Sequence, residues 1–303
     1  MRKFPFLNLL LFLVTVLSTM LVGAGLSGVA PTVLLERPVT ILKGIPFSLS
    51  LMLILLSHEF SHYFASKRHG VKATLPYFIP FPNIIGTLGA FIKMKSPIIT
   101  RSALIDIGAS GPIVGFIVSV VIAVIGLQMS EVVQVPKTAG TFHFGDSILF
   151  YYLYSLVIGV VPPGQDIVLH PIAFAGWIGL FVTSINLMPV GQLDGGHITY
   201  ALGGEGLHRK TSMAVFIILL FMGLTKLFIY ADIMSVSVEI YDYADKYLWE
   251  WWAMWAVILS FFGLRHPPVL HWETRLDSRR RFIGWITFFI FIITFIPVPV
   301  MVL

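Results

Sequence analysis

Long apolar stretches separated by short polar connections dominate the pattern of this chain. A helix needs roughly 20 mostly apolar residues to cross the hydrocarbon core of a bilayer. The pattern therefore predicts an all-α multi-pass membrane protein with about seven transmembrane helices. The seven stretches cover about residues 5–28, 42–66, 107–128, 172–202, 211–231, 247–264 and 282–303. The first is long for a signal peptide, so a retained signal-anchor is the preferred interpretation.

Basic residues are distributed unequally between the connections, and this predicts an orientation. Cytoplasmic loops carry an excess of Lys and Arg. With the N-terminus in the cytoplasm, seven spans collect most basic residues on the inside and put the C-terminus outside. The short apolar segment 148–162 would break this bias if it crossed, so we expect it to form an interfacial or partly inserted helix. The basic residues assigned to the inside are Arg2, Lys3, Lys67, Arg68, Lys72, Lys93, Lys95, Arg101, Arg209, Lys210, Arg265, Arg275 and Arg279–Arg281.

Residues 73–100 are apolar but rich in proline and glycine, unlike the helical stretches. Irregular backbone is tolerated at membrane depth only where protein covers it or where it lines a cavity. Within this segment TLGAFIKMK, residues 87–95, alternates loosely in the manner of a strand. We therefore expect a small membrane-embedded β-hairpin here.

Composition agrees with a membrane protein and excludes several functions. The chain of 303 residues is 57% hydrophobic and 12% charged, with a net charge of +5 and no cysteine. A soluble domain is about 45–50% apolar and about 25% charged. Without cysteine there are no disulfides, thiolate metal sites or cysteine nucleophiles. The basic balance fits cytoplasmic loops and anionic lipid, and no basic patch of the nucleic-acid-binding kind is present.

The second apolar stretch contains the motif H-E-x-x-H, formed by His58, Glu59 and His62. Positions i and i+4 of a helix lie on the same face, so two imidazoles there can bind one zinc ion while the glutamate acts as general base. Ionisable groups within a span are costly and indicate a functional site. The alternative is that the three residues form the cytoplasmic end of a helix, wetted by headgroups.

A catalytic zinc ion usually has three protein ligands and a water molecule. Among the predicted spans Asp194 is the best candidate for the third ligand. It follows Pro189 in a glycine-rich segment that would open the helix and free backbone groups to line a polar cavity. Asn186 adds an amide that could hold a carbonyl or an oxyanion. His197 could compete as a ligand, but a polar residue beside the site is the preferred interpretation.

These two motifs together resemble the site-2 protease family of zinc-dependent intramembrane proteases. In this resemblance His58 and His62 match the histidine ligands and Asp194 matches the aspartate ligand. Glu59 matches the catalytic glutamate, and Asn186 matches an asparagine that helps to position the substrate. The resemblance implies one Zn²⁺ per chain and hydrolysis of a peptide bond in or near a transmembrane segment of a membrane-protein substrate, as in regulated intramembrane proteolysis.

The resemblance covers about residues 42–202 and extends beyond the ligands. Residues 108–112 resemble the glycine-rich start of the family's third helix, and residues 73–95 resemble its strand hairpin. The pattern most resembles the prokaryotic and plastid branch, and we expect no PDZ or CBS module within these residues. We expect a signal-anchor and outside loop in 1–41, a catalytic membrane core in 42–202, and C-terminal transmembrane helices in 203–303.

Four further expectations concern smaller features. An exposed strand edge in 85–93, including Gly86 and Gly89, is predicted to hold an unwound substrate by strand addition. The spacing G-x-x-x-G of Gly111 and Gly115 predicts close packing of the third span against the metal-bearing span. Asp106 is expected to interact with the helix dipole at the start of the third helix. His69, His143, His170, His208, His266 and His271 are expected to be surface residues.

Two rival functions remain at this stage. The chain could be a non-catalytic zinc-binding membrane protein, although every matched motif residue is present, Glu59 in particular. It could also be a transporter that uses intramembrane His, Glu and Asp as an ion path. Transporters more often show internal repeats, and none is evident here. The predicted location is a cell membrane, with the active site toward the cytoplasmic side.

Overall fold

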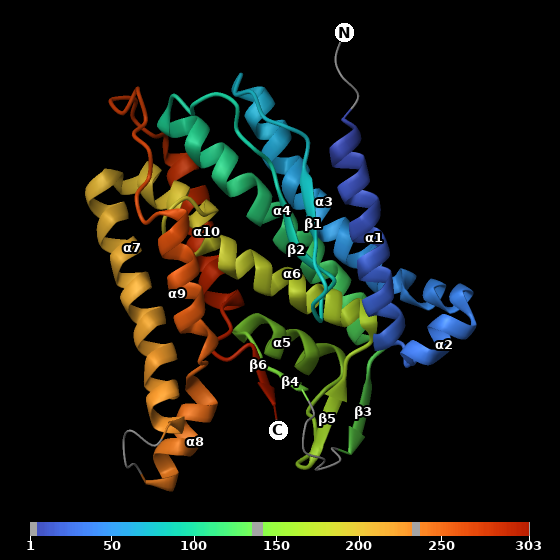
Figure 1. Cartoon of the computed structure of the whole chain (residues 1–303). Helices are drawn as coiled ribbons and strands as arrows, with labels where there is room; N and C mark the ends of the chain where they lie inside the picture. Colours follow the sequence, from blue (N-terminus) through green and yellow to red (C-terminus); the bar gives the residue numbers. More distant parts are fainter. Residues whose placement is uncertain (1–4, 135–141, 232–236, 303) are drawn as a thin grey trace. The chain divides into compact units, whose positions relative to one another are not determined.

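A computed structural model describes residues 5–134, 142–231 and 237–302 and is predominantly helical (Figure 1). The chain divides into two compact units. The first comprises Met1–Ile98, Ser110–Gln134 and Leu153–Leu180, and the second comprises Ile99–Ala109, Val135–Tyr152 and Phe181–Leu303. The helices α4 (Arg101–Leu127), α5 (Ile148–Val157) and α6 (Pro171–Leu187) each contribute residues to both units.

The first unit contains the N-terminal helices and two small sheets. Its remaining helices are α1 (Phe6–Leu26), α2 (Pro31–Glu36), the 3₁₀ helix η1 (Pro38–Gly44) and α3 (Ile45–Arg68). Its strands β1 (Tyr77–Pro80) and β2 (Thr87–Phe91) pair antiparallel, as do β3 (Glu131–Gln134) and β5 (Gln165–Val168).

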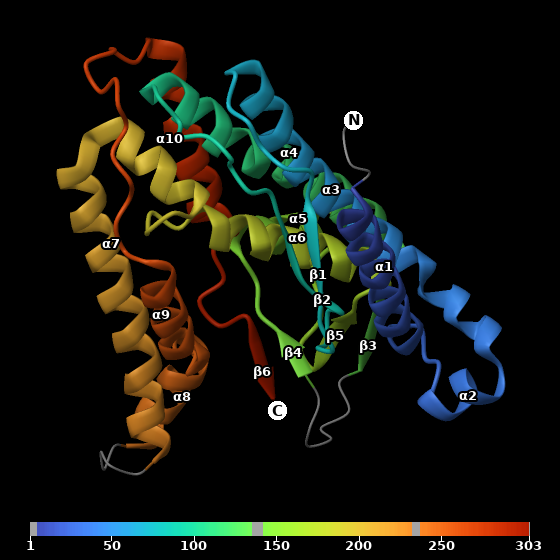
Figure 2. The same ribbon diagram turned by 45° about the horizontal axis from the view of Figure 1, so that its top comes forward.

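The second unit contains the C-terminal helices. These are α7 (Asp194–Tyr230), α8 (Val238–Tyr247), α9 (Trp251–Phe262) and α10 (Ser278–Thr294). Strand β4 (Phe142–Phe144) pairs antiparallel with β6 (Val300–Val302). Helices α7 and α9 run side by side in both views (Figures 1 and 2). Their contact is close because a Cβ atom on Gly223 of α7 would lie within 3.0 Å of the Ala253 backbone on α9.

Among the described residues, four helical segments are long and apolar enough to cross a membrane. They are Phe6–Leu26, Pro38–Arg68, Arg101–Leu127 and Asp194–Tyr230. The other apolar helices are shorter: α5 has 10 residues, α6 has 17 and α9 has 12. At a rise of about 1.5 Å per residue, α9 is about 18 Å long, well short of the roughly 30 Å hydrocarbon core. Helix length and composition thus support four candidate spans among the described residues, and the seven spans remain a prediction. Segment 148–162 contains the short helix α5, and its interfacial location also remains a prediction.

The predicted span 172–202 was wrong in its boundary. Helix α6 ends at Leu187, and α7 begins at Asp194 and continues for 37 residues. The intervening segment contains Pro189, which has no N–H to continue a helix, and Gly191, whose φ of +57° is left-handed. Within α7 a kink occurs at Gly204, where φ is +76°. The kinked helix α7 therefore contains both the end of the predicted span 172–202 and nearly all of the predicted span 211–231.

Strands β1 and β2 form an antiparallel hairpin in the predicted segment, and its location in a membrane remains a prediction. In this pairing Phe78 lies opposite Ala90 and Pro80 lies opposite Thr87. Strand β2 therefore has one more residue than β1 between these two pairs. This bulge includes Gly89, whose φ of +97° is accessible to glycine at low cost. The hairpin lies beside α1 in both views (Figures 1 and 2). Ser18 of α1 donates a 2.6 Å hydrogen bond to the carbonyl of Gly86.

Asp106 has a different partner from the one predicted. Helix α4 begins at Arg101, so Asp106 lies in its second turn rather than at its start. Its carboxylate accepts hydrogen bonds from Arg280 of α10, with 2.9 Å to Nε and 2.7 Å to the terminal nitrogen. An Arg–carboxylate pair of this bidentate kind gives geometric specificity. Asp106 thus attaches α10 to the first turns of α4.

Candidate metal centre

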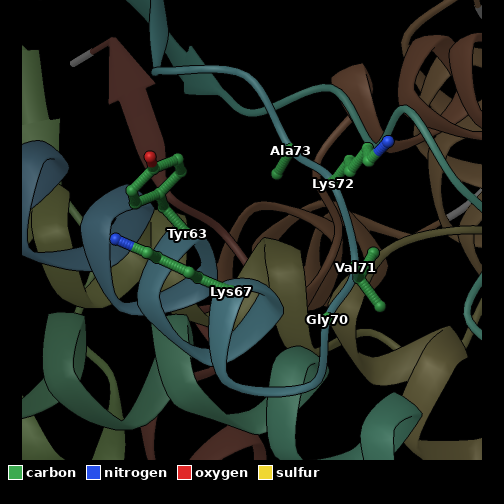
Figure 3. A pocket seen from close by; sticks show the side chains of 6 residues that line it. All are labelled: Tyr63, Lys67, Gly70, Val71, Lys72 and Ala73. Carbon is green, nitrogen blue, oxygen red and sulfur yellow. The ribbon is translucent and has the colours of Figure 1, made fainter.

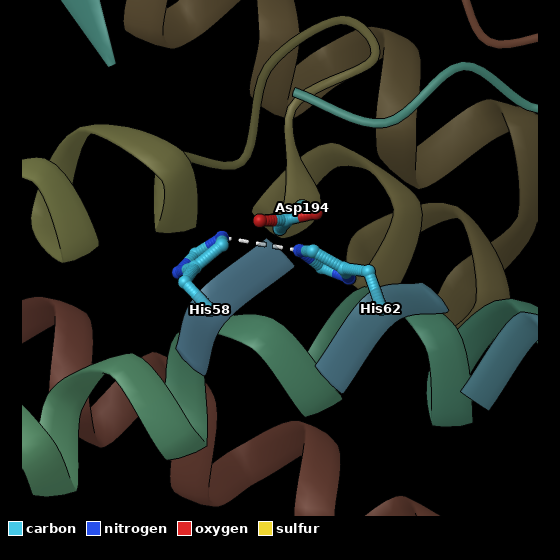
Figure 4. Close-up of side chains that lie close together, drawn as sticks. All are labelled: His58, His62 and Asp194. Atoms are coloured by element: carbon cyan, nitrogen blue, oxygen red, sulfur yellow. Dashed lines mark hydrogen bonds between the residues drawn. The ribbon is translucent and has the colours of Figure 1, made fainter. Parts of the chain in front are cut away.

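His58 and His62 lie one helical turn apart on α3, with side chains only 5% and 6% exposed. Their Nε2 atoms are 3.1 Å apart, and Figure 4 shows the two rings facing each other. Two nitrogens bound to one tetrahedral zinc ion at about 2.05 Å would be about 3.3 Å apart. The pair therefore fits two ligands of a single metal ion.

Small residues on α4 make room for these rings. A Cβ atom on Gly111 would lie within 3.0 Å of the His62 ring, and a Cβ atom on Gly115 would lie 2.9 Å from Nδ1 of His58. No real side chain makes contacts this close, so α4 can approach the histidines only because both positions are glycine. This confirms the predicted close packing of the third span against the metal-bearing helix through the G-x-x-x-G spacing.

Glu59 follows His58 on α3 and is also buried, with 6% of its side chain exposed. Helix α3 continues for nine residues beyond Glu59, to Arg68. The headgroup-wetted helix end is therefore the weaker interpretation of this motif. Burying a carboxylate costs several kcal/mol unless it is paired or neutralised, so a buried Glu59 indicates a functional role.

In the second unit, Asp194 is the first residue of α7, where the helix dipole favours a negative charge. The next two residues must be glycine because the backbone of the preceding turn lies very close to both of them. A Cβ atom on Gly195 would lie within 3.0 Å of the Leu187 carbonyl at the end of α6, and one on Gly196 would meet the Gly191 carbonyl. The D-G-G sequence thus lets the start of α7 pack directly against the turn that precedes it.

Two side chains from a later part of α7 form hydrogen bonds with the turn that precedes Asp194. His208 donates from Nε2 to the Gly191 carbonyl at 2.8 Å, and Ser212 accepts a 3.1 Å hydrogen bond from the Gly191 N–H. His208 is only 1% exposed, so its prediction as a surface residue was wrong. The reason is tertiary, because the turn leaves backbone groups that only a distant side chain can satisfy.

His58 and His62 of the first unit and Asp194 of the second unit are the three candidate ligands, and each offers one ligand atom (Figure 4). Two neutral imidazoles and one carboxylate form a donor set that suits Zn²⁺, and a fourth position then remains for water or substrate. The residues present therefore fit zinc.

Asn186 lies in the last turn of α6 and is partly exposed, in the same unit as Asp194. His197 lies three residues after Asp194 and is bonded to His266, with 2.6 Å between Nδ1 and Nε2. The prediction of His266 as a surface residue missed this contact. Nothing local to residue 266 indicates it, because the two histidines are 69 positions apart.

The two hairpin glycines have structural roles that the sequence did not separate. Gly86 packs against α1, since a Cβ atom there would lie 2.8 Å from the Ser18 carbonyl oxygen. Gly89 faces open space, and its N–H donates to Oγ1 of Thr87 at 3.0 Å. Gly86 thus packs closely against α1, and the substrate-binding roles of both glycines remain predictions.

A cavity of about 300 Å³ lies near the end of α3 and is separate from the metal ligands (Figure 3). Its lining consists of Tyr63, Lys67 and the backbone and side chains of residues 70–73. Figure 3 shows the side chains of Tyr63 and Lys67 on the α3 side of this space. It is a surface feature and contains none of the predicted site residues.

Comparison with known proteins places the chain in a family. The profile of peptidase family M50 matches residues 46–230, more than half of the chain. "Probable zinc metalloprotease EGY2, chloroplastic" of Arabidopsis thaliana is 29% identical over 261 residues, covering 84% of this chain and 42% of that protein. "Probable zinc metalloprotease EGY1, chloroplastic" of the same plant is 32% identical over 185 residues, covering 58% and 33%.

A third relative is "Probable zinc metalloprotease EGY3, chloroplastic" of Oryza sativa subsp. indica. It is 30% identical over 183 residues, covering 56% of this chain and 31% of that protein. The chain thus spans less than half the length of these relatives. No solved structure matches it. The family match contains all four motif residues, His58, Glu59, His62 and Asp194, and the chain belongs to peptidase family M50.

Proposed function

We propose that this chain is an intramembrane zinc metalloprotease that hydrolyses a peptide bond in or near a transmembrane segment of a membrane-protein substrate. The observation that carries the proposal is the pair His58 and His62 on one helix turn with the buried Glu59 beside them, in a chain of peptidase family M50 that also has the carboxylate of Asp194. Several helices are long and apolar enough to cross a bilayer, which supports an intramembrane location.

Glycines of helix α4 allow close packing in each of the two units. Gly111 and Gly115 lie against the two histidine rings of the first unit. Gly108 lies against the start of α7 within the second unit, because a Cβ atom there would be 3.5 Å from the Asp194 carbonyl oxygen. Close packing of α4 against each ligand-bearing element supports the proposal that Asp194 is the third ligand.

In the proposed hydrolysis, the metal and the side chains of the protein have different roles. When bound, zinc polarises the scissile carbonyl and lowers the pKa of a coordinated water to about 7. Glu59 takes the proton of the attacking water and passes it to the nitrogen of the leaving amine, so that the C–N bond can break. Asn186 donates its amide N–H to the substrate backbone and holds the carbonyl in place. Burial of Glu59 strengthens these charge interactions by excluding water.

The first test of the metal site is the zinc content of Asp194→Ala. We expect about one zinc per chain in the purified wild type and much less in the variant, because two imidazoles without the carboxylate leave an incomplete site. Metal content of detergent-purified protein measures this directly. A folded wild-type protein that held no zinc after zinc was supplied would contradict the proposal and favour an ion path.

A transmembrane substrate must unwind before cleavage, because a helix hides its carbonyls in hydrogen bonds. We propose that the edge of β2 holds the unwound segment by strand addition. In support, Leu88 in β2 is 59% exposed, and Gly89 beside it faces open space. Such an edge offers main-chain donors and acceptors to any extended peptide, and so favours no single side-chain sequence.

Leu88→Pro tests this edge, with Leu88→Ala as its matched control. Proline removes the N–H donor of residue 88, whereas alanine removes only the side chain. We expect Leu88→Pro to reduce cleavage of a labelled single-pass transmembrane peptide in micelles while zinc content stays at the wild-type level. Unchanged cleavage in the proline variant would exclude strand addition at this position.

We also propose a cell membrane as the location, with the N-terminus and the active site toward the cytoplasm. The bias of basic residues between connections supports this orientation. The proposed partners are the lipid bilayer and a transmembrane protein substrate. Because the chain has no cysteine, single cysteines introduced at Arg209 or Lys246 can report sidedness through an impermeant thiol reagent. Labelling of Lys246→Cys from the cytoplasmic side would contradict the orientation.

A further inference from the structure

Helix α7 changes direction at Gly204, and this change brings a later part of the helix back to its start. Gly204 has a φ of +76° and a ψ of −173°, outside the helical region, so two helical segments meet there. A straight helix from Asp194 to His208 would be about 21 Å long. An imidazole side chain cannot reach across that distance, yet Nε2 of His208 lies 2.8 Å from the Gly191 carbonyl oxygen. The kink is therefore what allows this contact.

Side chains from outside α7 stabilise the kink, all within the second unit. Carbonyls at the end of a helical segment need donors from elsewhere. Arg101 donates from Nε to the Ala201 carbonyl at 2.9 Å and from a terminal nitrogen to the Leu202 carbonyl at 3.3 Å. The Arg101 guanidinium also lies 4.1 Å from the centre of the Trp272 ring, and that ring lies 3.0 Å from where a Cβ atom on Gly204 would be. The bent form of α7 is thus supported by hydrogen bonds and by packing.

His208 and Ser212, one turn apart after the kink, bind both backbone groups of Gly191. Nε2 of His208 carries the proton of its hydrogen bond, because a carbonyl oxygen can only accept. The Gly191 N–H donates to Oγ of Ser212 at 3.1 Å. Both residues are only 1% exposed, so water does not compete for these backbone groups. Two buried hydrogen bonds from one helical turn therefore fix the orientation of Gly191.

The backbone of Gly191 in turn limits where α7 can begin. The Gly191 carbonyl oxygen lies within 3.0 Å of where a Cβ atom on Gly196 would be, two residues after Asp194. Between them, the Leu193 N–H donates to the Val190 carbonyl at 3.3 Å. Asp194 lies in the chain between two backbone segments that touch each other. A fixed Gly191 therefore restrains the residue that carries the carboxylate.

We propose that His208 and Ser212 are positioning residues for Asp194, which fix the turn before α7 so that the carboxylate is held in place as a metal ligand. This inference rests on the metal role that the proposed function gives to Asp194. Groups that orient a metal ligand change metal affinity by roughly tenfold to a hundredfold when they are removed. His208 acts on Asp194 through the backbone of the turn, so an effect at the lower end of this range is expected.

Two substitutions of His208 separate its hydrogen bond from its packing. His208→Phe keeps a ring of similar shape but removes the donor, whereas His208→Gln offers an amide N–H near the position of Nε2. We expect the zinc Kd of detergent-purified protein, measured by competition with a chelator, to rise about tenfold in His208→Phe. In His208→Gln the zinc Kd should stay close to wild type.

His271→Phe is the matched control, because its side chain is exposed and the variant keeps the backbone N–H that donates to Ile99. Its zinc Kd should equal that of the wild type. If His208→Phe does not fold, Ser212→Ala gives the same test, since it removes the acceptor for the Gly191 N–H. Circular dichroism and elution volume show which variants are folded.

Hydrogen exchange in the metal-free protein reports the turn itself. We expect faster amide exchange over residues 190–195 in His208→Phe than in wild type, His208→Gln and His271→Phe, because loss of the donor frees the turn. Wild-type zinc Kd or wild-type exchange in a folded His208→Phe protein would overturn the proposal. Equal losses in His208→Phe and His208→Gln would also overturn it, because they would show that the ring acts by packing alone.

Failure of the proposed function gives a different pattern of results. If zinc Kd and exchange change as expected but no protein cleaves a labelled transmembrane peptide, the protease function fails and the positioning of Asp194 stands. If the folded wild type binds no zinc, the metal role fails, and hydrogen exchange alone decides whether His208 fixes the turn before Asp194.

Discussion

Glu59→Gln is expected to lower peptide cleavage by roughly a hundredfold to ten-thousandfold, the range that general acid–base groups contribute. Glutamine has nearly the same shape as glutamate but cannot take a proton from water. The metal ligands lie on other residues, so zinc content should stay at about one per chain. Cleavage of a labelled single-pass transmembrane peptide in micelles and metal content of the same preparation measure the two effects.

Glu36→Gln is a suitable control for this substitution. Glu36 ends the short helix α2 and is exposed, so the same change of charge there should alter neither quantity. A Glu59→Gln protein that cleaves at the wild-type rate would show that another group activates the water. Altered metal flux through reconstituted vesicles, together with unchanged cleavage, would favour the ion-path alternative.

Gly111→Ala is expected to abolish most zinc binding, although residue 111 is not a ligand. The added methyl group would lie within 3.0 Å of the His62 ring, so either the ring or helix α4 must move. Backbone of a packed helix moves less readily than a side chain, and Zn–N distances tolerate only about 0.2 Å. We expect zinc content well below one per chain and a loss of cleavage that follows it.

Gly206→Ala provides the matched control, because a Cβ atom on this helical glycine of α7 would meet nothing within 4 Å. Alanine also has the higher helix propensity, so this variant should fold and bind zinc as the wild type does. If Gly111→Ala were folded and retained full zinc content, the close packing of α4 against His62 would be wrong. Circular dichroism and elution volume distinguish loss of metal from loss of fold.

The candidate residues of the site were identified from local sequence. H-E-x-x-H places His58 and His62 on one helix face whatever surrounds them, because the period of a helix is fixed by backbone geometry. Asp194 stood out because a carboxylate within an apolar stretch is costly and needs a partner. Pro189 also predicted correctly that the helix opens before Asp194, since proline cannot donate the N–H that a helix requires.

The number of spans was less predictable, because hydropathy reports how apolar a stretch is and not where its helix ends. The stretch 172–202 was counted as one span, although Pro189 indicated a break, and the turn there divides it into α6 and α7. The last apolar stretches form the 12-residue α9 and the 17-residue α10, both shorter than the sequence suggested. Tertiary contacts can satisfy backbone groups at such breaks, and hydropathy carries no information about those contacts.

The sequence by itself therefore indicated the candidate metal ligands, the candidate general base and the apolar character of the chain, all of which depend on residue type and helical period. Only the tertiary structure decided which neighbours support them. The glycine face of α4 backs the two histidines. His208 holds the turn before Asp194, and His266 bonds His197 across 69 positions. Such contacts join residues far apart in the chain, so no local pattern encodes them, and packing alone brings their atoms within bonding distance.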